Sequence, residues 1–260
     1  MPRQLFIGDI HGHYNGLRAL WKLIDPAADD QVYFVGDLID RGPRSADVVE
    51  FVRHHATGCV RGNHEQLLID AIGQDGGGTV RLSHLEGWLY SGGQATLSSY
   101  DPSPYLLAEH LHWIAQLPAY LDLGHLWLVH AGVNPNLPLS QQNPHDMCWI
   151  RDLFHRSHTP YFANKLIITG HTITFTFPAV DPGQVVAGQG WIDIDTGVYH
   201  PRSGWLTALD WDNQQVYQVN VFSAQYRVRP YAEAVTFLDP TLIGPRSPGI
   251  ARRVSRLSHS

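Results

Sequence analysis

Cysteine is scarce in this chain of 260 residues, which contains only Cys59 and Cys148. The two cysteines lie far apart and form no C-x-x-C pair, which excludes a disulfide framework and a thiolate zinc site. Apolar runs are short: none approaches the ~18 residues of a membrane span, and the N-terminal apolar stretch is too short for a signal peptide. We therefore expect a cytoplasmic protein with no membrane partner.

Charge is limited as well, and the excess is negative. Charged residues make up 16% of the chain and the formal net charge is -6. A general nucleic-acid-binding surface needs a basic excess, so we expect no stable nucleic-acid partner. Hydrophobic residues make up 43%, which is typical of a globular protein. Histidine is the abundant type, with 16 residues against 18 Lys and Arg together, and this ratio favours metal chemistry.

The first third of the chain alternates short apolar strands with amphipathic helices. Strands are predicted at 5–7 and 32–35, and helices at 15–24 and 46–55, the last with Ser45 as its cap. Strands that alternate with helices pair in parallel. Ligands of such sheets lie beyond the carboxyl ends of the strands, so the functional residues are expected there.

Further strands are predicted along the rest of the chain. Two apolar strands lie at 126–129 and 166–168. Three later segments alternate apolar and polar residues, at 191–195, 204–211 and 215–222. Alternation of this kind indicates half-buried strands, and we expect these three to continue the sheet system in antiparallel fashion.

The chain is expected to form one catalytic domain over residues 1–240. Within it, residues 74–115 contain Gly76-Gly77-Gly78, Gly92-Gly93, Pro102 and Pro104, and they are interpreted as a helical and loop insertion. The insertion either packs against the core or forms a lid over the site. The segment 241–260 contains four arginines and no acidic residue, which predicts a basic, mobile tail.

Five short motifs follow predicted strand ends. Each contains residue types that bind divalent metals, together with glycines that allow sharp turns. One such motif alone is more often a turn with a satisfied polar pair, but five in this arrangement indicate a single site. The motifs are Gly8-Asp9-Ile10-His11-Gly12, Gly36-Asp37-Leu38-Ile39-Asp40-Arg41-Gly42, Gly62-Asn63-His64-Glu65, His130-Ala131-Gly132 and Gly170-His171-Thr172.

This set resembles the signature of the calcineurin-like metallophosphoesterases, and Asp40-Arg41-Gly42 resembles that of their phosphoprotein phosphatase branch. The resemblance covers roughly residues 5–210 and extends to the phosphatase of bacteriophage lambda and to small bacterial Ser/Thr protein phosphatases. It implies an α/β fold, namely a four-layer αββα sandwich with mixed sheets.

The resemblance also implies two divalent metal ions, which we expect to be manganese, with iron or zinc as alternatives. A hydroxide that bridges two cations is available near neutral pH and would attack phosphorus. By family correspondence, Asp37 bridges the two ions. The first ion would be bound by Asp9, His11 and Asp37, and the second by Asp37, Asn63, His130 and His171.

The remaining catalytic roles are also implied by the resemblance. His64 would protonate the leaving alkoxide as general acid, with Asp40 orienting it. Arg41 would clamp the phosphate, and Arg151 matches a second phosphate-binding arginine. Asn63 would contact the substrate as well as a metal.

The roles of three other residues stay open. Tyr199 and His200 either border the site or form a surface turn. Glu65 either supports the ligands by hydrogen bonds or is a plain helix-start carboxylate.

Three functions fit these observations. The first is a Ser/Thr protein phosphatase, or one of dual specificity, that acts on phosphorylated protein or small phosphomonoesters. The second is a nucleotide hydrolase such as a diadenosine tetraphosphate hydrolase, for which Trp88, Tyr90 and Trp113 would supply a stacking face. That family commonly lacks the acid at the position of Asp40, which favours the first function. The third is a non-catalytic binding module, which the intact ligand set disfavours.

Overall fold

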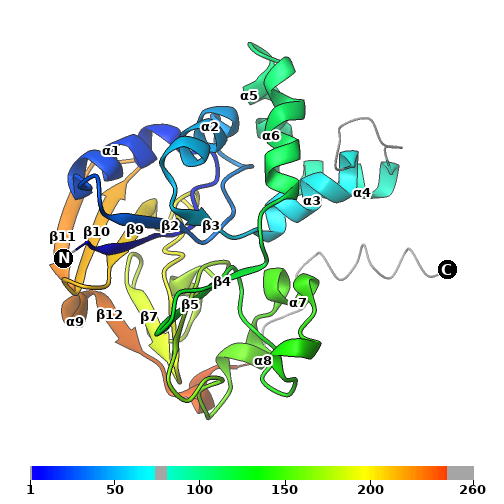
Figure 1. Cartoon of the computed structure of the whole chain (residues 1–260). Coiled ribbons are helices and arrows are strands. Elements are labelled where there is room, and N and C mark those ends of the chain that lie inside the picture. Colours follow the sequence, from blue (N-terminus) through cyan, green and yellow to red (C-terminus); the bar gives the residue numbers. More distant parts are fainter. Residues whose placement is uncertain (1, 74–80, 245–260) are drawn as a thin grey trace.

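The computed structural model describes residues 2–73 and 81–244, which form two stacked six-stranded sheets covered by helices (Figure 1). The first sheet has the strand order β11-β10-β9-β1-β2-β3 and the second β12-β7-β8-β6-β5-β4. Strands of the first sheet are β1 Gln4–Ile7, β2 Gln31–Phe34, β3 Gly58–Cys59, β9 Trp205–Asp210, β10 Gln215–Asn220 and β11 Tyr226–Pro230. Strands of the second are β4 Tyr120–Asp122, β5 Leu126–Val129, β6 Leu166–Thr169, β7 Val185–Gly188, β8 Trp191–Asp193 and β12 Val235–Phe237.

Both sheets are mixed, as expected. In the first, β1, β2 and β3 run parallel, whereas β9, β10 and β11 are antiparallel to their neighbours. In the second, β5, β6 and β8 are parallel and β4 and β7 run against them. Strand alternation sends successive side chains to opposite faces. Leu5 therefore packs toward the helices and Phe6 between the sheets, while Leu128 lies between the sheets and Trp127 on the outer face.

The helices complete the outer layers. Those of the first sheet are α1 Tyr14–Ile24 and α2 Ser45–His55, and α7 Pro144–Trp149 and α8 Asp152–His155 lie on the outer side of the second (Figure 1). The order helix, sheet, sheet, helix confirms the expected fold class. The short helix α9, Tyr231–Ala234, joins β11 to β12. No helix in residues 2–73 or 81–244 is both long and apolar enough to cross a membrane.

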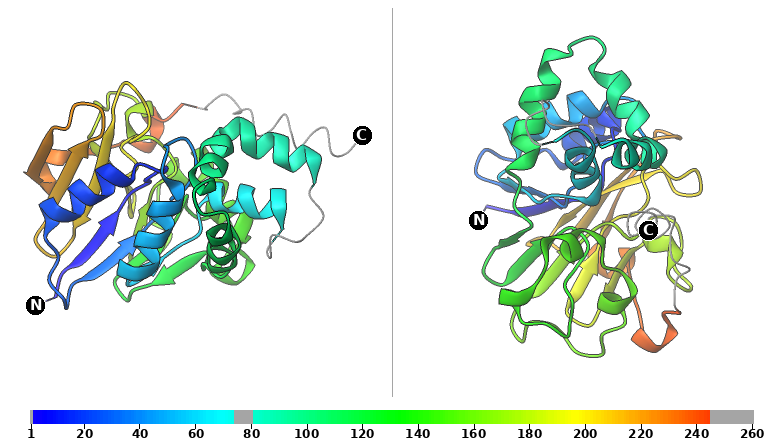
Figure 2. Two further views of the ribbon diagram at one scale, coloured as in Figure 1. Left: turned by 90° about the horizontal axis from the view of Figure 1, so that it is seen from above. Right: turned by 90° about the vertical axis from the view of Figure 1, so that its right-hand side faces the viewer.

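The insertion is mostly helical in its described part. It follows α3 Asn63–Ile72 and comprises α4 Leu82–Trp88, a π-helical turn Leu89–Gly93, α5 Gln94–Tyr100 and α6 Tyr105–Ala115. Figure 2 shows these helices standing beside the sheets as a separate lobe. Residues 74–80 of the predicted insertion and 245–260 of the predicted tail lie outside the described residues.

Two local expectations were wrong. Ser45 does not cap α2: it is the first residue of the helix, and its hydroxyl accepts the N–H of Asp40 at 3.1 Å. The segment 191–195 does not continue an antiparallel series with the two strands after it. β8 lies in the second sheet, parallel to β6, whereas β9 and β10 extend the first. Alternation of apolar residues specifies the buried face of a strand but not its neighbour.

Candidate metal centre

The five motifs meet where strands of both sheets end. Asp9 and His11 follow β1, Asp37 follows β2, and Asn63 follows β3 in the first sheet. His130 and His171 follow β5 and β6 of the second sheet, directly beneath. The parallel pairing of β1, β2 and β3, and of β5 and β6, brings these ends to one edge of the stacked sheets.

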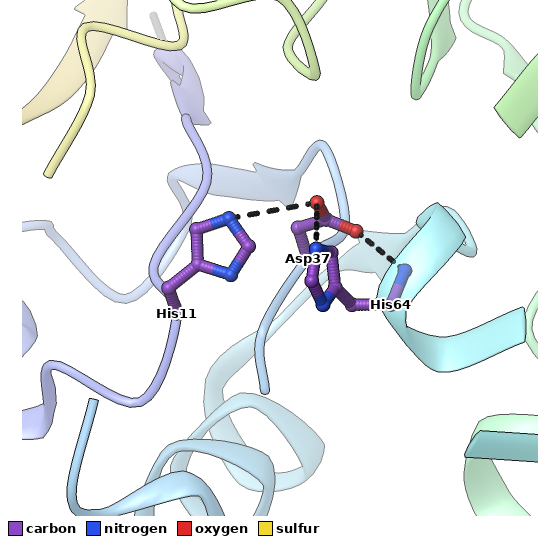
Figure 3. A group of neighbouring side chains, drawn as sticks. All are labelled: His11, Asp37 and His64. Carbon is purple, nitrogen blue, oxygen red and sulfur yellow. Dashed lines mark hydrogen bonds and ion pairs between the residues drawn. The ribbon is translucent and has the colours of Figure 1, made fainter. Parts of the chain in front are cut away.

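Asp37 lies at the centre of this arrangement and has histidines on either side (Figure 3). Its Oδ2 is 3.6 Å from His11 Nε2 and 3.9 Å from His64 Nε2. Its Oδ1 is 3.4 Å from His130 Nε2 and accepts the backbone N–H of His64 at 3.0 Å. Among the described residues, Asp37 belongs to both groups with metal-binding geometry, one with His11 and His64 and the other with His130 and His171.

The side chain of Asn63 lies between the two histidines of the second group, His130 and His171. Its Oδ1 lies 3.0 Å from His130 Nε2 and 2.7 Å from His171 Nδ1. The Nδ1–H of His130 donates to the carbonyl of Val35 at 2.8 Å. Because burial also lowers the pKa of His130, the ring is neutral and its Nε2 carries a lone pair. Three electron-pair donors, on Asn63, His130 and Asp37, therefore face one another.

His11 shows the same pattern in the first group. Its Nδ1–H donates to the carbonyl of Ile39 at 3.0 Å, which leaves a lone pair on Nε2. Burial, and then the nearby charge of Arg41, lowers the pKa of His11 well below its usual value. Arg41 Nη1 lies 2.6 Å from Nε2, so this lone pair already faces a cation. Metal-binding histidines usually donate one ring N–H to a carbonyl or carboxylate, which leaves the lone pair of the other nitrogen for the metal.

Asp9 takes part in the site less directly. It is buried, and its carboxylate accepts the backbone N–H of His171 at 3.2 and 3.3 Å. It belongs to neither of the two tight groups among the described residues. Burial raises the pKa of Asp9 well above its usual value, and the neighbouring carboxylates of Asp195 and Asp37 raise it further. Such an accumulation of buried negative charge, beside lone pairs without protons, fits the binding of divalent cations.

A strained turn contains the candidate ligand Asp37 together with Asp40 and Arg41. Asp37, Asp40 and Arg41 have φ values of 50°, 73° and 70°, in the left-handed region that such residues rarely adopt. Glu65 holds this turn: its buried carboxylate accepts the N–H groups of Asp37 and Leu38, each at 2.8 Å. Glu65 is therefore a support for the site rather than a plain helix-start carboxylate.

Asp40 and His64 form a buried pair. His64 Nδ1 lies 2.6 Å from Asp40 Oδ2, and the two side chains are 2% and 0% exposed. Because a carboxylate can only accept, His64 Nδ1 carries the hydrogen and Nε2 faces Asp37. The Asp40 carboxylate also accepts from the indole Nε1 of Trp88 at 3.0 Å and from the hydroxyl of Thr96 at 2.6 Å.

The two arginines lie on different sides of the site. Arg41 stacks on Tyr199, with 3.9 Å between its guanidinium carbon and the ring centroid, so Tyr199 borders the site. Arg151 Nη1 donates to the carbonyl of His171 at 3.1 Å and to the Thr172 hydroxyl at 3.0 Å. His200 follows Tyr199 in the chain, and its ring contacts that of Phe175 instead of Arg41.

Sequence reasoning missed Trp88 and Thr96 as partners of Asp40. The sequence suggests Trp88 as part of a stacking face, but this residue is fully buried. Trp113 lines a surface cleft of about 320 Å³ with Val52 and Thr57, near the start of β3 and away from the ligands. The pair Gly92-Gly93 was the one feature of the sequence that could have indicated this contact, because it marks the kink after α4, the helix that ends at Trp88.

Comparison with known proteins agrees with this geometry. Symmetrical bis(5'-nucleosyl)-tetraphosphatase of Vibrio cholerae is 31% identical over 137 residues, which are 52% of this chain and 46% of that protein. Serine/threonine-protein phosphatase 1 of Salmonella typhimurium is 33% identical over 119 residues, 43% of this chain and 51% of that one. The chain thus spans about half the length of the curated relatives that it matches.

A solved structure described as a putative diadenosine tetraphosphatase shares the fold, with a TM-score of 0.57 at 19% identity over 88% of this chain and 96% of that one. The calcineurin-like phosphoesterase family matches residues 2–186, a range that includes β1 to β6 and every ligand candidate described above. Two groups of its described residues could hold a metal ion, and the chain belongs to the calcineurin-like phosphoesterase family.

Proposed function

We propose that this protein is a metal-dependent phosphomonoesterase of the phosphoprotein phosphatase type, and that residues 1–240 form its catalytic domain. The observation that carries the proposal is the buried contact of 2.6 Å between His64 and Asp40. A monoester with an alkoxide leaving group needs a proton at the bridging oxygen, and a histidine backed by a carboxylate supplies it. Hydrolysis of an anhydride has less need for such an acid, because phosphate is a better leaving group.

The metal ligands follow from the two groups around Asp37. Asp9, His11 and Asp37 would hold one ion, and Asp37, Asn63, His130 and His171 the other. Imidazole, carboxylate and amide oxygen together suit manganese, with iron or zinc as alternatives. When bound, the two ions supply a nucleophilic water at neutral pH and offset the charge of the phosphate.

The proton path follows from the position of the His64 ring. His64 donates its Nδ1–H to Asp40, so the ring can carry a second proton only on Nε2, which faces the ligands. The charge of Asp40 stabilises the resulting imidazolium. Nε2–H would then be transferred to the leaving oxygen, and a water would return a proton to the ring afterwards.

Arg41 and Arg151 would bind the phosphate from two sides. Tyr199 holds the Arg41 guanidinium by stacking on it, and the carbonyl of His171 holds that of Arg151. A guanidinium has more donors than either of these contacts uses, so each arginine retains N–H groups for phosphate oxygens. This arrangement recognises the phosphate without reading the group attached to it.

Hydrolysis of dinucleoside polyphosphates is the second candidate, and the names of relatives such as the Vibrio cholerae protein favour it. A base-specific enzyme needs an aromatic face beside the site. Trp88 is buried against Asp40 and Trp113 lies elsewhere, so neither can stack on a base. Of the three aromatic residues considered, only Tyr90 is exposed, at 74%.

A substrate panel distinguishes the two candidates. The purified protein with Mn²⁺ would be assayed on phosphoserine, phosphothreonine and phosphotyrosine peptides and on diadenosine tetraphosphate. We expect kcat/KM to be higher for the phosphopeptides, with little preference for their sequence. A diadenosine tetraphosphate value more than about tenfold higher, or roughly 1.4 kcal/mol of transition-state preference, would replace the proposal with the second candidate.

A further inference from the structure

The helical insertion reaches into the site at Asp40. Trp88, the last residue of α4, donates its indole N–H to both carboxylate oxygens of Asp40 at 3.0 Å. Thr96, on α5, donates its hydroxyl to Oδ1 at 2.6 Å. Trp88, Thr96 and Asp40 are each 0% exposed. Two donors from one insertion therefore converge on a single buried carboxylate.

These two donors complete the hydrogen bonding of the Asp40 carboxylate, which the motif residues alone leave incomplete. A carboxylate removed from water must find hydrogen-bond donors, or its burial is costly. Within the motifs, His64 supplies one donor to the Asp40 carboxylate, on Oδ2. Trp88 and Thr96 supply the others from 48 and 56 residues further along the chain. The Thr96 hydroxyl also accepts the backbone N–H of Asp40 at 2.9 Å, so it holds both ends of that residue.

A kink at Gly92, between α4 and α5, fits the insertion to the Asp40–Arg41 turn. The carbonyl of Gly92 accepts the N–H of Arg41 at 3.2 Å. Gly92 has a φ of 117°, and a Cβ there would lie 2.8 Å from Arg41 Cγ. A Cβ on Gly93 would lie 2.4 Å from the Trp88 ring. Among the standard residues, only glycine allows so close an approach at these two positions.

We propose that Trp88 and Thr96 are positioning residues for proton transfer by His64. By fixing the Asp40 carboxylate, they keep Oδ2 on His64 Nδ1 and thereby keep Nε2 directed at the ligands. This inference rests on the proposed function, because it takes the proton-donor role of His64 from it. The insertion acts as a brace for the catalytic pair, a role distinct from the lid or simple packing element expected from its composition.

Substitutions that remove the two donors test the inference. Trp88→Phe keeps an aromatic ring in the core, and Thr96→Val is nearly isosteric. Each would be assayed with Mn²⁺ on a phosphoserine peptide, which needs leaving-group protonation, and on p-nitrophenyl phosphate, which needs less. We expect kcat to fall about 10- to 100-fold on the peptide and less than about threefold on the aryl phosphate, with unchanged metal content. Thr96→Ser, which retains a hydroxyl, should restore most of the peptide rate.

Trp191→Phe is the matched control. Trp191 is 1% exposed, and its indole N–H has no hydrogen-bond partner among the described residues. The control therefore makes the same change of ring in a buried position without removing a donor from Asp40. It should leave the ratio of the two kcat values as in the wild type.

His64→Ala, measured on the same two substrates, separates the inference from the proposed function. If His64→Ala loses equal rate on both substrates, the general-acid role is wrong and the proposed function fails with it. If His64→Ala shows the leaving-group dependence but Trp88→Phe and Thr96→Val do not, only the positioning inference is overturned. Should Trp88→Phe fail to fold, as judged by circular dichroism, Thr96→Val alone decides the question.

Discussion

Replacing Asp40 with asparagine measures how far the reaction depends on the charge behind His64. The 2.6 Å contact between His64 Nδ1 and Asp40 Oδ2 places the centres of the two charged groups about 4 Å apart. At an effective dielectric constant of ~20, an imidazolium and a carboxylate at that distance attract by about 4 kcal/mol. A neutral hydrogen bond from His64 would retain about 1 kcal/mol. The remaining loss of about 3 kcal/mol predicts a kcat on a phosphoserine peptide that is lower by about two orders of magnitude.

The assay compares kcat, metal content and thermal stability of Asp40→Asn with those of the wild type. Asp210→Asn is the control, because Asp210 is also 0% exposed and accepts hydrogen bonds from Asn213, at the end of β9. We expect the control to retain its peptide rate. A folded, metal-loaded Asp40→Asn protein with a rate within about threefold of the wild type would refute the reasoning, since the charge would then contribute less than about 1 kcal/mol.

Three further predictions concern other parts of the molecule. His64→Ala should lower kcat on phosphopeptides by roughly 10²–10⁴-fold, and by less on p-nitrophenyl phosphate; an equal loss on both would mean that His64 is a ligand or a structural residue. Asp37→Asn should bind fewer metal ions and be the most damaging ligand change, because Asp37 contacts both groups; wild-type metal content and rate in this variant would rule out a bridge. Asp30→Asn should lower the free energy of unfolding by about 1 kcal/mol at neutral pH. The Arg3 side chain, by hydrogen bonding, lowers the pKa of Asp30 to about 2, so this contribution is present above about pH 4 and is lost as the pH falls toward 2. Urea unfolding at several pH values checks this, and a difference that stays constant down to pH 2 would contradict it.

The predicted strands were found where short apolar runs end in Gly-Asp, and the candidate ligand residues lie at their ends. Short apolar strands that end in Gly-Asp predict β1 and β2, and their parallel pairing brings Asp9 and Asp37 to one edge. His130 and His171 follow the same rule in the second sheet. In these cases, the residues that bear the chemistry are adjacent in sequence to the element that positions them.

The expectations failed where partners are distant in sequence. The hydrogen bond from Trp88 to Asp40 has no periodic signal, because it joins a helix to a loop across 48 residues. The role of Tyr199 stayed open at the level of sequence, because this residue reaches Arg41 from the segment in which the chain crosses from one sheet to the other. The sheet to which β8 belongs was missed for a related reason, since alternation gives a buried face without naming a neighbour.

Metal content and activity measured on the same samples test the central claim most directly. Protein freed of metal by a chelator would be titrated with Mn²⁺, and bound metal and the rate of phosphoserine peptide hydrolysis would be recorded at each step. The account predicts no activity without metal, two ions bound per chain at saturation, and a rate that rises as the second ion binds. Full activity in the presence of chelator would contradict it. A rate that reaches its maximum while no metal is bound to the protein would contradict it as well.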